Sequence, residues 1–306
     1  MSGEAAAVHP PAGAWRARLG DLAALTKPRL NLLVLMAAAA GFCLGSPGAV
    51  DLAAMAHALG GILLVAFGSS ILNQVREREF DARMARTGAR PLAAGRLAAG
   101  AAVGLGIGLA VLGAAYLLAT TNRICAGLAV LTLLLYLFLY TPLKRITPLN
   151  TLVGAFPGAL PPLIGWAAAG KLDASAGTLF AIVYLWQMPH FYAIAWLYRD
   201  DYARGGFKMF PVGDPDGRAT GRRMVLYSLA LLPIAWTPAV FGLAGFGYAL
   251  GSVLLTLAFA AFAVGFYVQR SDAAARRLFL ASVIYLPLLL GLLFWNPPPH
   301  GFPLGR

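Results

Sequence analysis

Nine blocks of predominantly apolar residues, each about 20 residues long, dominate the sequence. A helix of that length crosses the roughly 30 Å hydrocarbon core of a bilayer, whereas a spanning β-barrel requires alternating segments of about ten residues. Only 12% of the residues are charged, which excludes an ordinary soluble domain with about 25%. The sequence predicts an all-α, polytopic membrane protein with transmembrane helices at about 24–45, 52–75, 98–119, 124–140, 148–168, 174–197, 224–242, 245–268 and 276–295.

The distribution of Lys and Arg predicts the orientation of these nine helices. If the spans alternate, 21 of the 24 basic residues fall on one side of the membrane, and only Arg123, Lys171 and Arg306 fall on the other. Loops rich in Lys and Arg remain in the cytoplasm, so we expect a cytoplasmic N-terminus. The net charge of +12 then reflects topology and affinity for anionic headgroups or substrates, and we expect no nucleic-acid partner.

Two long polar loops, at about 76–97 and 199–223, lie on the expected cytoplasmic side. Each follows an apolar span, and they lie about 120 residues apart, so we expect two four-helix halves preceded by the first span. Residues 1–22 are expected to form a flexible N-terminal tail and 298–306 a C-terminal tail. This leaves 23–297 as a single transmembrane domain with its polar loops at the cytoplasmic surface.

A row of polar side chains follows the span 52–75. Asn73, Glu77 and Asp81 are spaced four residues apart, so a continuing helix would bring them onto one face, about 6 Å apart per step. One amide and two carboxylates suit Mg²⁺, which binds one or two protein carboxylates and completes its shell with water and substrate phosphate. The arginines between them leave open an alternative, a solvated helix end that carries both signs of charge.

Further charged residues are expected on the same side of the membrane: the cations Arg86, Arg90, Lys144 and Arg145, and the carboxylates Asp200 and Asp201. Guanidinium groups match phosphate oxygens in a bidentate way, and the second carboxylate pair would supply another cation site. Proline-rich spans such as 148–168 are expected to kink and to open toward an interior space. The pattern predicts a site for an amphiphile whose diphosphate binds at the membrane surface and whose hydrocarbon tail enters the bundle.

His190 lies within the expected span 174–197, directly after Pro189. An ionisable residue within a membrane span is a functional candidate, and an imidazole can bind heme iron. The alternative is a histidine hydrogen-bonded to a carbonyl that Pro189 leaves free.

Several motifs lie between residues 26 and 212. They are Asn73-x-x-x-Glu77-x-x-x-Asp81-x-x-Met84-x-Arg86-Thr87-x-x-Arg90-Pro91-Leu92, Tyr140-Thr141-Pro142-Leu143-Lys144-Arg145, Pro161-Pro162-Leu163-Ile164-Gly165-Trp166 and Trp186-Gln187-Met188-Pro189-His190-Phe191. Together they resemble the intramembrane prenyltransferases of the UbiA type, and more narrowly their protoheme IX farnesyltransferase (heme O synthase) branch. Glu77 stands where bacterial members of that branch usually carry Asp.

The resemblance implies a UbiA-type helix bundle that binds farnesyl diphosphate and heme b. It implies transfer of the farnesyl group to a heme vinyl group, with addition of water, to give heme O. It also implies a bacterial inner membrane, an active site that faces the cytoplasm, and heme A synthase or oxidase assembly proteins as candidate partners. The expected catalytic and Mg²⁺-binding residues are Asn73, Glu77, Asp81, Asp200 and Asp201, the diphosphate-binding residues Arg86, Arg90, Lys144 and Arg145, and the heme-binding residue His190.

Two alternatives remain open. A UbiA-type enzyme would also suit an aromatic or quinone-precursor acceptor, although the run around His190 favours heme. A secondary transporter would bury ionisable residues within its spans. Here the 24 basic and 12 acidic residues fall at predicted helix ends or in loops, which favours an enzyme.

Overall fold

The computed structural model describes residues 14–170 and 172–297, and within these residues it contains helices and no strands. Eight helical segments are long and apolar enough to cross a bilayer, which confirms the prediction of an all-helical membrane protein. The segments are α2 (Pro28–Gly45), α3 (Leu52–Asp81), α4 (Ala99–Thr120), α5 to α6 (Arg123–Ile146), α7 to α8 (Asn150–Ala169), α11 (Arg218–Val240), α12 (Phe246–Gln269) and α13 (Asp272–Trp295).

The ninth expected span is α9 (Ala174–Leu197), which has 24 residues but is not among these eight segments. Polar side chains lower its hydropathy, and two of them bind neighbouring helices. Gln187 donates to the carbonyl oxygen of Ala155 in α7, at 2.7 Å, and His190 contacts Ser282 in α13. The polar residues of α9 therefore serve contacts inside the bundle.

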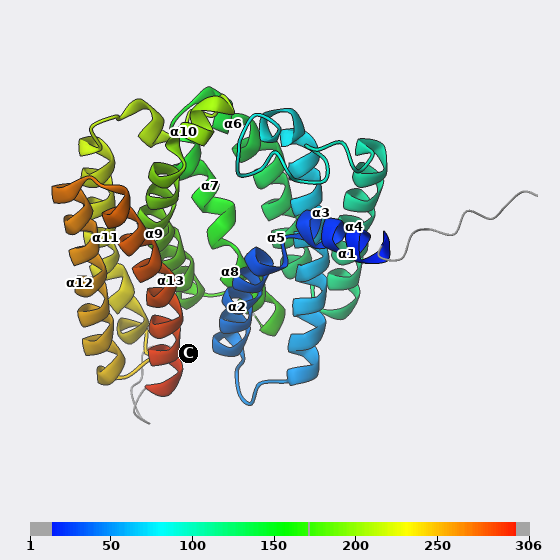
Figure 1. Cartoon of the computed structure of the whole chain (residues 1–306). Coiled ribbons are helices and arrows are strands. Elements are labelled where there is room, and N and C mark those ends of the chain that lie inside the picture. The colour runs from blue at the N-terminus through cyan, green and yellow to red at the C-terminus, as the bar shows by residue number, and fades with distance from the viewer. Residues whose placement is uncertain (1–13, 171, 298–306) are drawn as a thin grey trace, which may run out of the picture.

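The long helices form two groups, with α7 and α8 between them (Figure 1). α9, α11, α12 and α13 lie on one side, and α2 to α5 lie on the other. Two hydrophobic clusters follow this division, one around Met188 and Leu231 and one around Val65 and Leu117. Because α8 contributes to both clusters, whereas α7 contributes to the first, the expected grouping of their span with the N-terminal half alone is incomplete.

The span made of α7 (Asn150–Ala159) and α8 (Pro161–Ala169) is broken at Leu160. Pro161 and Pro162 have no backbone N–H to continue the helical ladder, as the proline pattern predicted. α8 crosses α2 so closely that a Cβ atom on Gly165 would contact the carbonyl oxygen of Ala38. This crossing therefore requires glycine at position 165.

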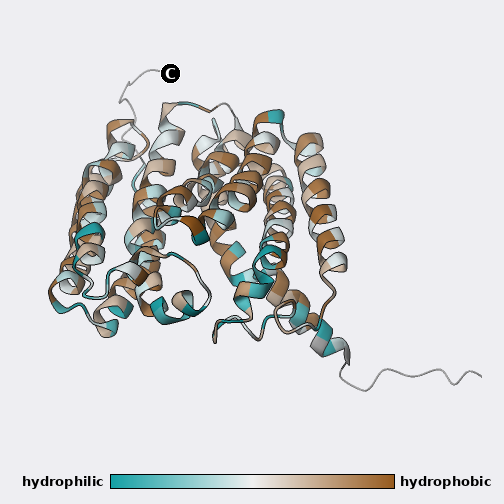
Figure 2. Ribbon diagram, turned by 90° about the horizontal axis from the view of Figure 1, so that it is seen from above, coloured by the Kyte–Doolittle hydropathy of each residue, from teal (hydrophilic) through white to brown (hydrophobic). Residues whose placement is uncertain are grey.

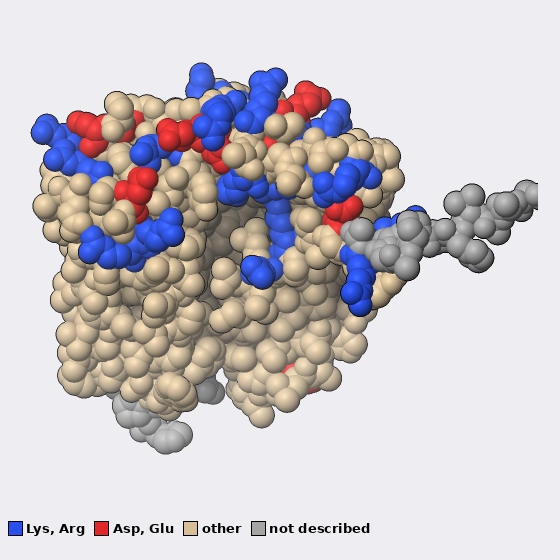
Figure 3. Space-filling view, viewed as in Figure 1, with Lys and Arg blue, Asp and Glu red and all other residues tan. Residues whose placement is uncertain are grey.

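The helices are mostly hydrophobic along their length (Figure 2), and charged side chains gather at one end of the bundle (Figure 3). The short helices α6 (Thr141–Ile146) and α10 (Arg199–Arg204) lie at this end, together with the loops that follow α3 and α10 (Figure 1). A π-helical turn, η1 (Leu135–Tyr140), joins α5 (Arg123–Leu134) to α6, and a 3₁₀ turn, η2 (Phe210–Gly213), precedes α11.

Several predicted boundaries differ from the structure. Residues 14–22, expected in a flexible tail, belong to α1 (Ala14–Thr26), and the remaining expected tail residues, 1–13 and 298–306, lie outside the described residues. α3 continues to Asp81, and α11 already begins at Arg218, so both helices extend into the expected polar loops. Hydropathy marks where a chain leaves the lipid, and a helix can continue beyond that point.

Candidate functional site

The predicted polar row occupies the C-terminal end of α3. Because α3 continues to Asp81, Asn73, Glu77 and Asp81 lie on one helical face, and all three line a cavity of about 90 Å³. These residues are buried, with exposed fractions of 1%, 5% and 2%. The predicted helical continuation is confirmed, and the alternative of a solvated helix end is wrong for these three residues.

Each carboxylate of the row is paired with a cation from another segment. Lys144 Nζ lies 2.8 Å from Glu77 Oε1, and Arg90 Nη1 lies 2.7 Å from Asp81 Oδ2. The second oxygen of each carboxylate has no hydrogen-bond partner among residues 14–170 and 172–297. These oxygens can therefore accept a further ligand while both ion pairs remain in place.

The π-helical turn brings two tyrosines to the same cavity. Tyr136 donates its hydroxyl proton to Asn73 Oδ1, at 3.3 Å, and Asn73 Nδ2 donates to Thr141 Oγ1, at 3.0 Å. Tyr136 and Tyr140 both line the cavity, and π-helical turns are frequent at functional sites. Neither tyrosine was predicted as a site residue, because aromatic residues in an apolar span look like ordinary core or lipid-facing residues.

Lys27 also lines the cavity, although the sequence did not predict it as a site residue. It occupies the sharp link between α1 and α2, where its φ is 50°. Gln74 holds the end of α1 nearby by donating to two backbone carbonyl oxygens, at 3.1 and 2.7 Å. Burial, reinforced by the positive charge of Arg90, lowers the pKa of Lys27 to about 7 against the attraction of Glu77. The only signal in the sequence was a lysine directly before the proline that begins a span.

Asp201 lies beside the loop that follows α3. Its carboxylate accepts hydrogen bonds from the backbone N–H groups of Ala85 and Arg86, at 3.1 and 3.2 Å, and pairs with Arg204. Burial acts to raise the pKa of Asp201, but these hydrogen bonds outweigh it and hold the pKa below its usual value. Asp200 is exposed, and neither aspartate lines the cavity. The two acidic segments therefore meet at one end of the bundle, and a second cation site there stays a prediction.

Three of the four predicted diphosphate-binding cations line the cavity: Arg86, Arg90 and Lys144. The guanidinium of Arg86 lies over the ring of Tyr198, with its Cζ 4.9 Å from the ring centroid. Arg145 is exposed and lies over the ring of Phe80 instead, at 4.6 Å, so it is not part of the cavity wall.

Two carboxylates line this cavity together with the cations Arg86, Arg90 and Lys144, and Lys27 adds a fourth positive charge when it is protonated. The excess of positive charge suits a polyanion such as diphosphate. In the part of the chain that the structure describes, no three His, Cys, Asp or Glu residues lie close enough together to hold a metal ion by themselves. The oxygens of the row nevertheless fit Mg²⁺, because this ion takes few protein ligands and completes its shell with water and phosphate.

His190 lies in α9, away from the row. It is half-buried, stacks on Trp186 with ring centroids 5.3 Å apart, and packs on Phe279 at 5.1 Å. Its Nδ1 atom lies 2.7 Å from the hydroxyl oxygen of Ser282. This hydrogen bond connects the imidazole to a side chain of another helix rather than to a carbonyl freed by Pro189.

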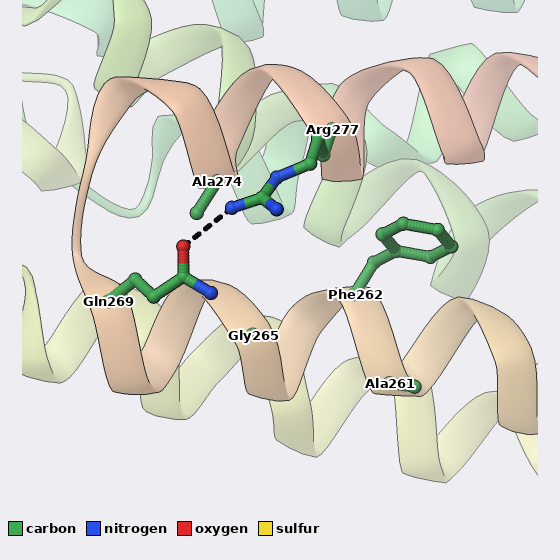
Figure 4. Close-up of a pocket in the computed structure, with 6 residues that line it drawn as sticks. All are labelled: Ala261, Phe262, Gly265, Gln269, Ala274 and Arg277. Atoms are coloured by element: carbon green, nitrogen blue, oxygen red, sulfur yellow. Dashed lines mark hydrogen bonds between the residues drawn. The ribbon is translucent and has the colours of Figure 1, made fainter.

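A larger cavity of about 230 Å³ lies between α12 and α13 (Figure 4). It is lined by Ala261, Phe262, Gly265, Gln269, Ala274 and Arg277. Arg277 donates to Gln269 Oε1 at 2.5 Å, and no carboxylate lies in this wall. It therefore lacks the groups for metal and diphosphate binding that line the first cavity.

The chain matches the model of the UbiA prenyltransferase family over residues 34–295. A protoheme IX farnesyltransferase of Solibacter usitatus (strain Ellin6076) is 46% identical over 288 residues, which cover 91% of this chain and 99% of the relative. The mitochondrial protoheme IX farnesyltransferase of Arabidopsis thaliana is 40% identical over 272 residues, which cover 88% of this chain and 63% of the relative.

Solved structures show the same fold at low sequence identity. A UbiA homolog from Archaeoglobus fulgidus bound to DMAPP and Mg²⁺ superposes with a TM-score of 0.68 at 15% identity, covering 90% of this chain and 99% of that one. A structure from work on digeranylgeranylglyceryl phosphate synthase in membranes has a TM-score of 0.76 at 15% identity, covering 92% and 98%. The family match, the curated relatives and the shared fold confirm the resemblance inferred from the motifs, and the chain belongs to the UbiA prenyltransferase family.

Proposed function

We propose that this protein transfers the farnesyl group of farnesyl diphosphate to a vinyl group of heme b, with addition of water, and forms heme O and diphosphate. The observation that carries the proposal is the cavity in which the row Asn73, Glu77 and Asp81 meets four cations at the charged end of an apolar bundle. The relatives named protoheme IX farnesyltransferase, at 46% and 44% identity, support heme as the acceptor.

Asn73, Glu77 and Asp81 would hold Mg²⁺ together with oxygens of the diphosphate. When bound, the ion would neutralise charge that grows on the leaving oxygen as the allylic C–O bond breaks. The UbiA homolog from Archaeoglobus fulgidus that was solved with DMAPP and Mg²⁺ supports this pairing of ligands. The predicted second cation site at Asp200 and Asp201 would lie beside this cavity rather than in its wall.

The cations of the cavity would bind the leaving diphosphate. Arg86, Arg90 and Lys144 were predicted for this role, and Lys27 joins them because it lines the same wall. A preplaced donor of this kind is commonly worth about 3–4 kcal/mol in the transition state. Arg145 would act only through the surface potential of this face, because it points out of the cavity.

The farnesyl cation would lie against the aromatic part of the wall. Tyr136, Tyr140, Tyr202 and Phe207 line the cavity, and aromatic faces attract cations. A vinyl carbon of heme b would form the new C–C bond, and water would then add to the resulting cation and lose a proton. His190 is the candidate residue for binding the heme.

The names of the relatives favour heme over an aromatic or quinone-precursor acceptor, and the family assignment favours an enzyme over a secondary transporter.

We also propose that α9 is the ninth span. Its 24 residues reach about 36 Å, which exceeds the hydrocarbon thickness. The end with most charges would then face the cytoplasm of a bacterial inner membrane, where heme A synthase or oxidase assembly proteins are candidate partners.

The test is product formation by the purified protein. It should convert heme b and farnesyl diphosphate, with Mg²⁺, into a farnesylated hydroxyethyl heme that mass spectrometry detects. Asp81→Ala should abolish the product, whereas Asp21→Ala, which removes a surface carboxylate paired with Arg96 at 2.7 Å, should not. A folded protein that prenylates only an added aromatic acceptor would replace this proposal with the alternative.

A further inference from the structure

One residue of α13, Ser282, holds two aromatic side chains of α9. Trp186 donates from Nε1 to the backbone carbonyl oxygen of Ser282, at 2.8 Å, and Nδ1 of His190 lies 2.7 Å from its hydroxyl oxygen. Trp186 and His190 are four residues apart and therefore neighbours on one face of α9. Ser282 is thus the point at which α13 fixes this face.

The direction of the hydrogen bond between His190 and Ser282 follows from the single proton on the Ser282 hydroxyl group. The hydroxyl oxygen of Ser282 also lies 2.5 Å from the carbonyl oxygen of Phe279, which can only accept. Since a hydroxyl has one proton, both contacts are hydrogen bonds only if Ser282 donates to Phe279 and accepts from the Nδ1–H group of His190. A neutral imidazole with its proton on Nδ1 has a lone pair on Nε2.

Aromatic packing fixes the plane of the imidazole. The ring of Trp186 lies on His190 at an interplanar angle of 25°, and the ring of Phe279 lies at 32°. The hydrogen bond to Ser282 sets which edge of the imidazole faces α13. The position of Nε2 is therefore determined by three neighbours.

The face of α9 that carries His190 lies between α7 and α13. Gln187 binds α7 and Trp186 binds α13, and at 100° per residue His190 lies about 60° from the first and about 40° from the second, between them. His190 is half-buried, so part of the residue is accessible. Figure 3 shows a hollow between the two groups of helices, and in Figure 1 α13 borders this gap while α7 lies behind its upper part.

We infer that Ser282 is a positioning residue for the heme acceptor. It holds His190 as the Nδ1–H tautomer, and Nε2 is then the atom that binds the heme iron. A histidine that ligates a metal usually donates its other N–H group to a hydrogen-bond acceptor, which orients the ring and raises the basicity of the ligating nitrogen. The inference rests on the proposed function, because it requires a heme acceptor.

The test measures iron ligation without turnover. Ferric heme b is added to the purified protein in lipid nanodiscs, in the absence of farnesyl diphosphate, and absorption and electron paramagnetic resonance spectra are recorded. We expect nitrogen-ligated iron with the unmodified protein, loss of that signature in His190→Ala, and its return when imidazole is added. Ser282→Ala should weaken heme binding about tenfold or more, and Ser282→Thr, which keeps the hydroxyl, should bind as tightly as the unmodified protein.

Ser252 provides the matched control. It is buried in α12, and its hydroxyl donates to a carbonyl three residues earlier, at 2.9 Å, as that of Ser282 does. Ser252→Ala should bind heme like the unmodified protein, so a loss confined to Ser282→Ala supports the inference. Unchanged heme affinity in Ser282→Ala, or a nitrogen-ligated spectrum in His190→Ala, overturns it.

Product formation separates this inference from the proposed function. If the unmodified protein farnesylates heme b while His190→Ala keeps nitrogen-ligated iron, only the role of His190 and Ser282 is refuted. If the unmodified protein neither binds nor farnesylates heme b, the proposed function fails, and the inference fails with it.

Discussion

Replacing Lys144 with Met should destabilise the protein, because Lys144 neutralises a buried carboxylate. Lys144 Nζ lies 2.8 Å from Glu77 Oε1, and the two side chains are 13% and 7% exposed. Removing one partner of a buried ion pair leaves the other charge without compensation, at a cost of about 3–5 kcal/mol. Since Lys27 and Arg90 in the same cavity wall also attract Glu77, and the cavity can admit water, we expect the lower value, about 3 kcal/mol.

A double variant separates the charge effect from a packing effect. Glu77→Gln with Lys144→Met removes both charges, so no unpaired buried carboxylate remains and most of the lost stability should return. The resulting coupling energy should be about 2–3 kcal/mol. Farnesyl transfer should remain absent, because the variant lacks both a metal ligand and a diphosphate-binding cation.

Reversible unfolding in mixed micelles, followed by tryptophan fluorescence, measures these free energies. The control is Arg96→Met, which breaks a surface pair with Asp21 whose side chains are 47% and 21% exposed. Exposed pairs contribute about 0–1 kcal/mol, so this variant should unfold almost like the unmodified protein. Lys144→Met with unchanged stability, or a double variant that is less stable than Lys144→Met alone, would refute the reasoning.

Three further changes are measured in the same unfolding assay. Asp201→Asn weakens the acceptor of two loop N–H groups and should lower the free energy of unfolding by about 1–2 kcal/mol. Asp200→Asn, at an exposed position, should not change it measurably. Equal effects of the two substitutions would contradict these assignments. Gly165→Ala places a methyl group against α2 and should lower the free energy of unfolding by about 1–3 kcal/mol. Gly177→Ala should not destabilise the protein, because no atom lies within 4 Å of the added Cβ. Between pH 7 and 10.5 the unfolded chain carries a proton on Lys27 that the folded chain has released, so stability should rise with pH across this window. Lys27→Met should remove that rise. If the stability of this variant instead changed with pH just as that of the unmodified protein does, Lys27 would not be buried.

Hydropathy predicted the membrane helices well, because a bilayer imposes a length and a composition on any helix that crosses it. Local spacing predicted the row Asn73, Glu77 and Asp81 for a similar reason, since all three lie on one helix and the helix repeat alone aligns them. These features depend on residues close together in the sequence.

The wall opposite the row was harder to predict because it depends on tertiary contacts. Lys144 and Arg145 are adjacent on α6, so their side chains point about 100° apart and only Lys144 faces the cavity. The position of Lys27 depends on the turn between α1 and α2. Asp201 accepts hydrogen bonds from the loop after α3 and does not line the cavity. Charge and composition predicted which residue types meet at this end of the bundle, but not which of them share a wall.

The proposed reaction depends most on joint binding of Mg²⁺ and diphosphate by the end of α3 and the cations around it. Calorimetric titration of inorganic diphosphate into the purified protein, with and without Mg²⁺, measures this directly. We predict that Mg²⁺ tightens binding at least about tenfold in the unmodified protein. In Glu77→Gln with Asp81→Asn, the cations should still bind diphosphate but the effect of Mg²⁺ should vanish. An undiminished effect of Mg²⁺ in that double variant would contradict the assignment of the metal to this row.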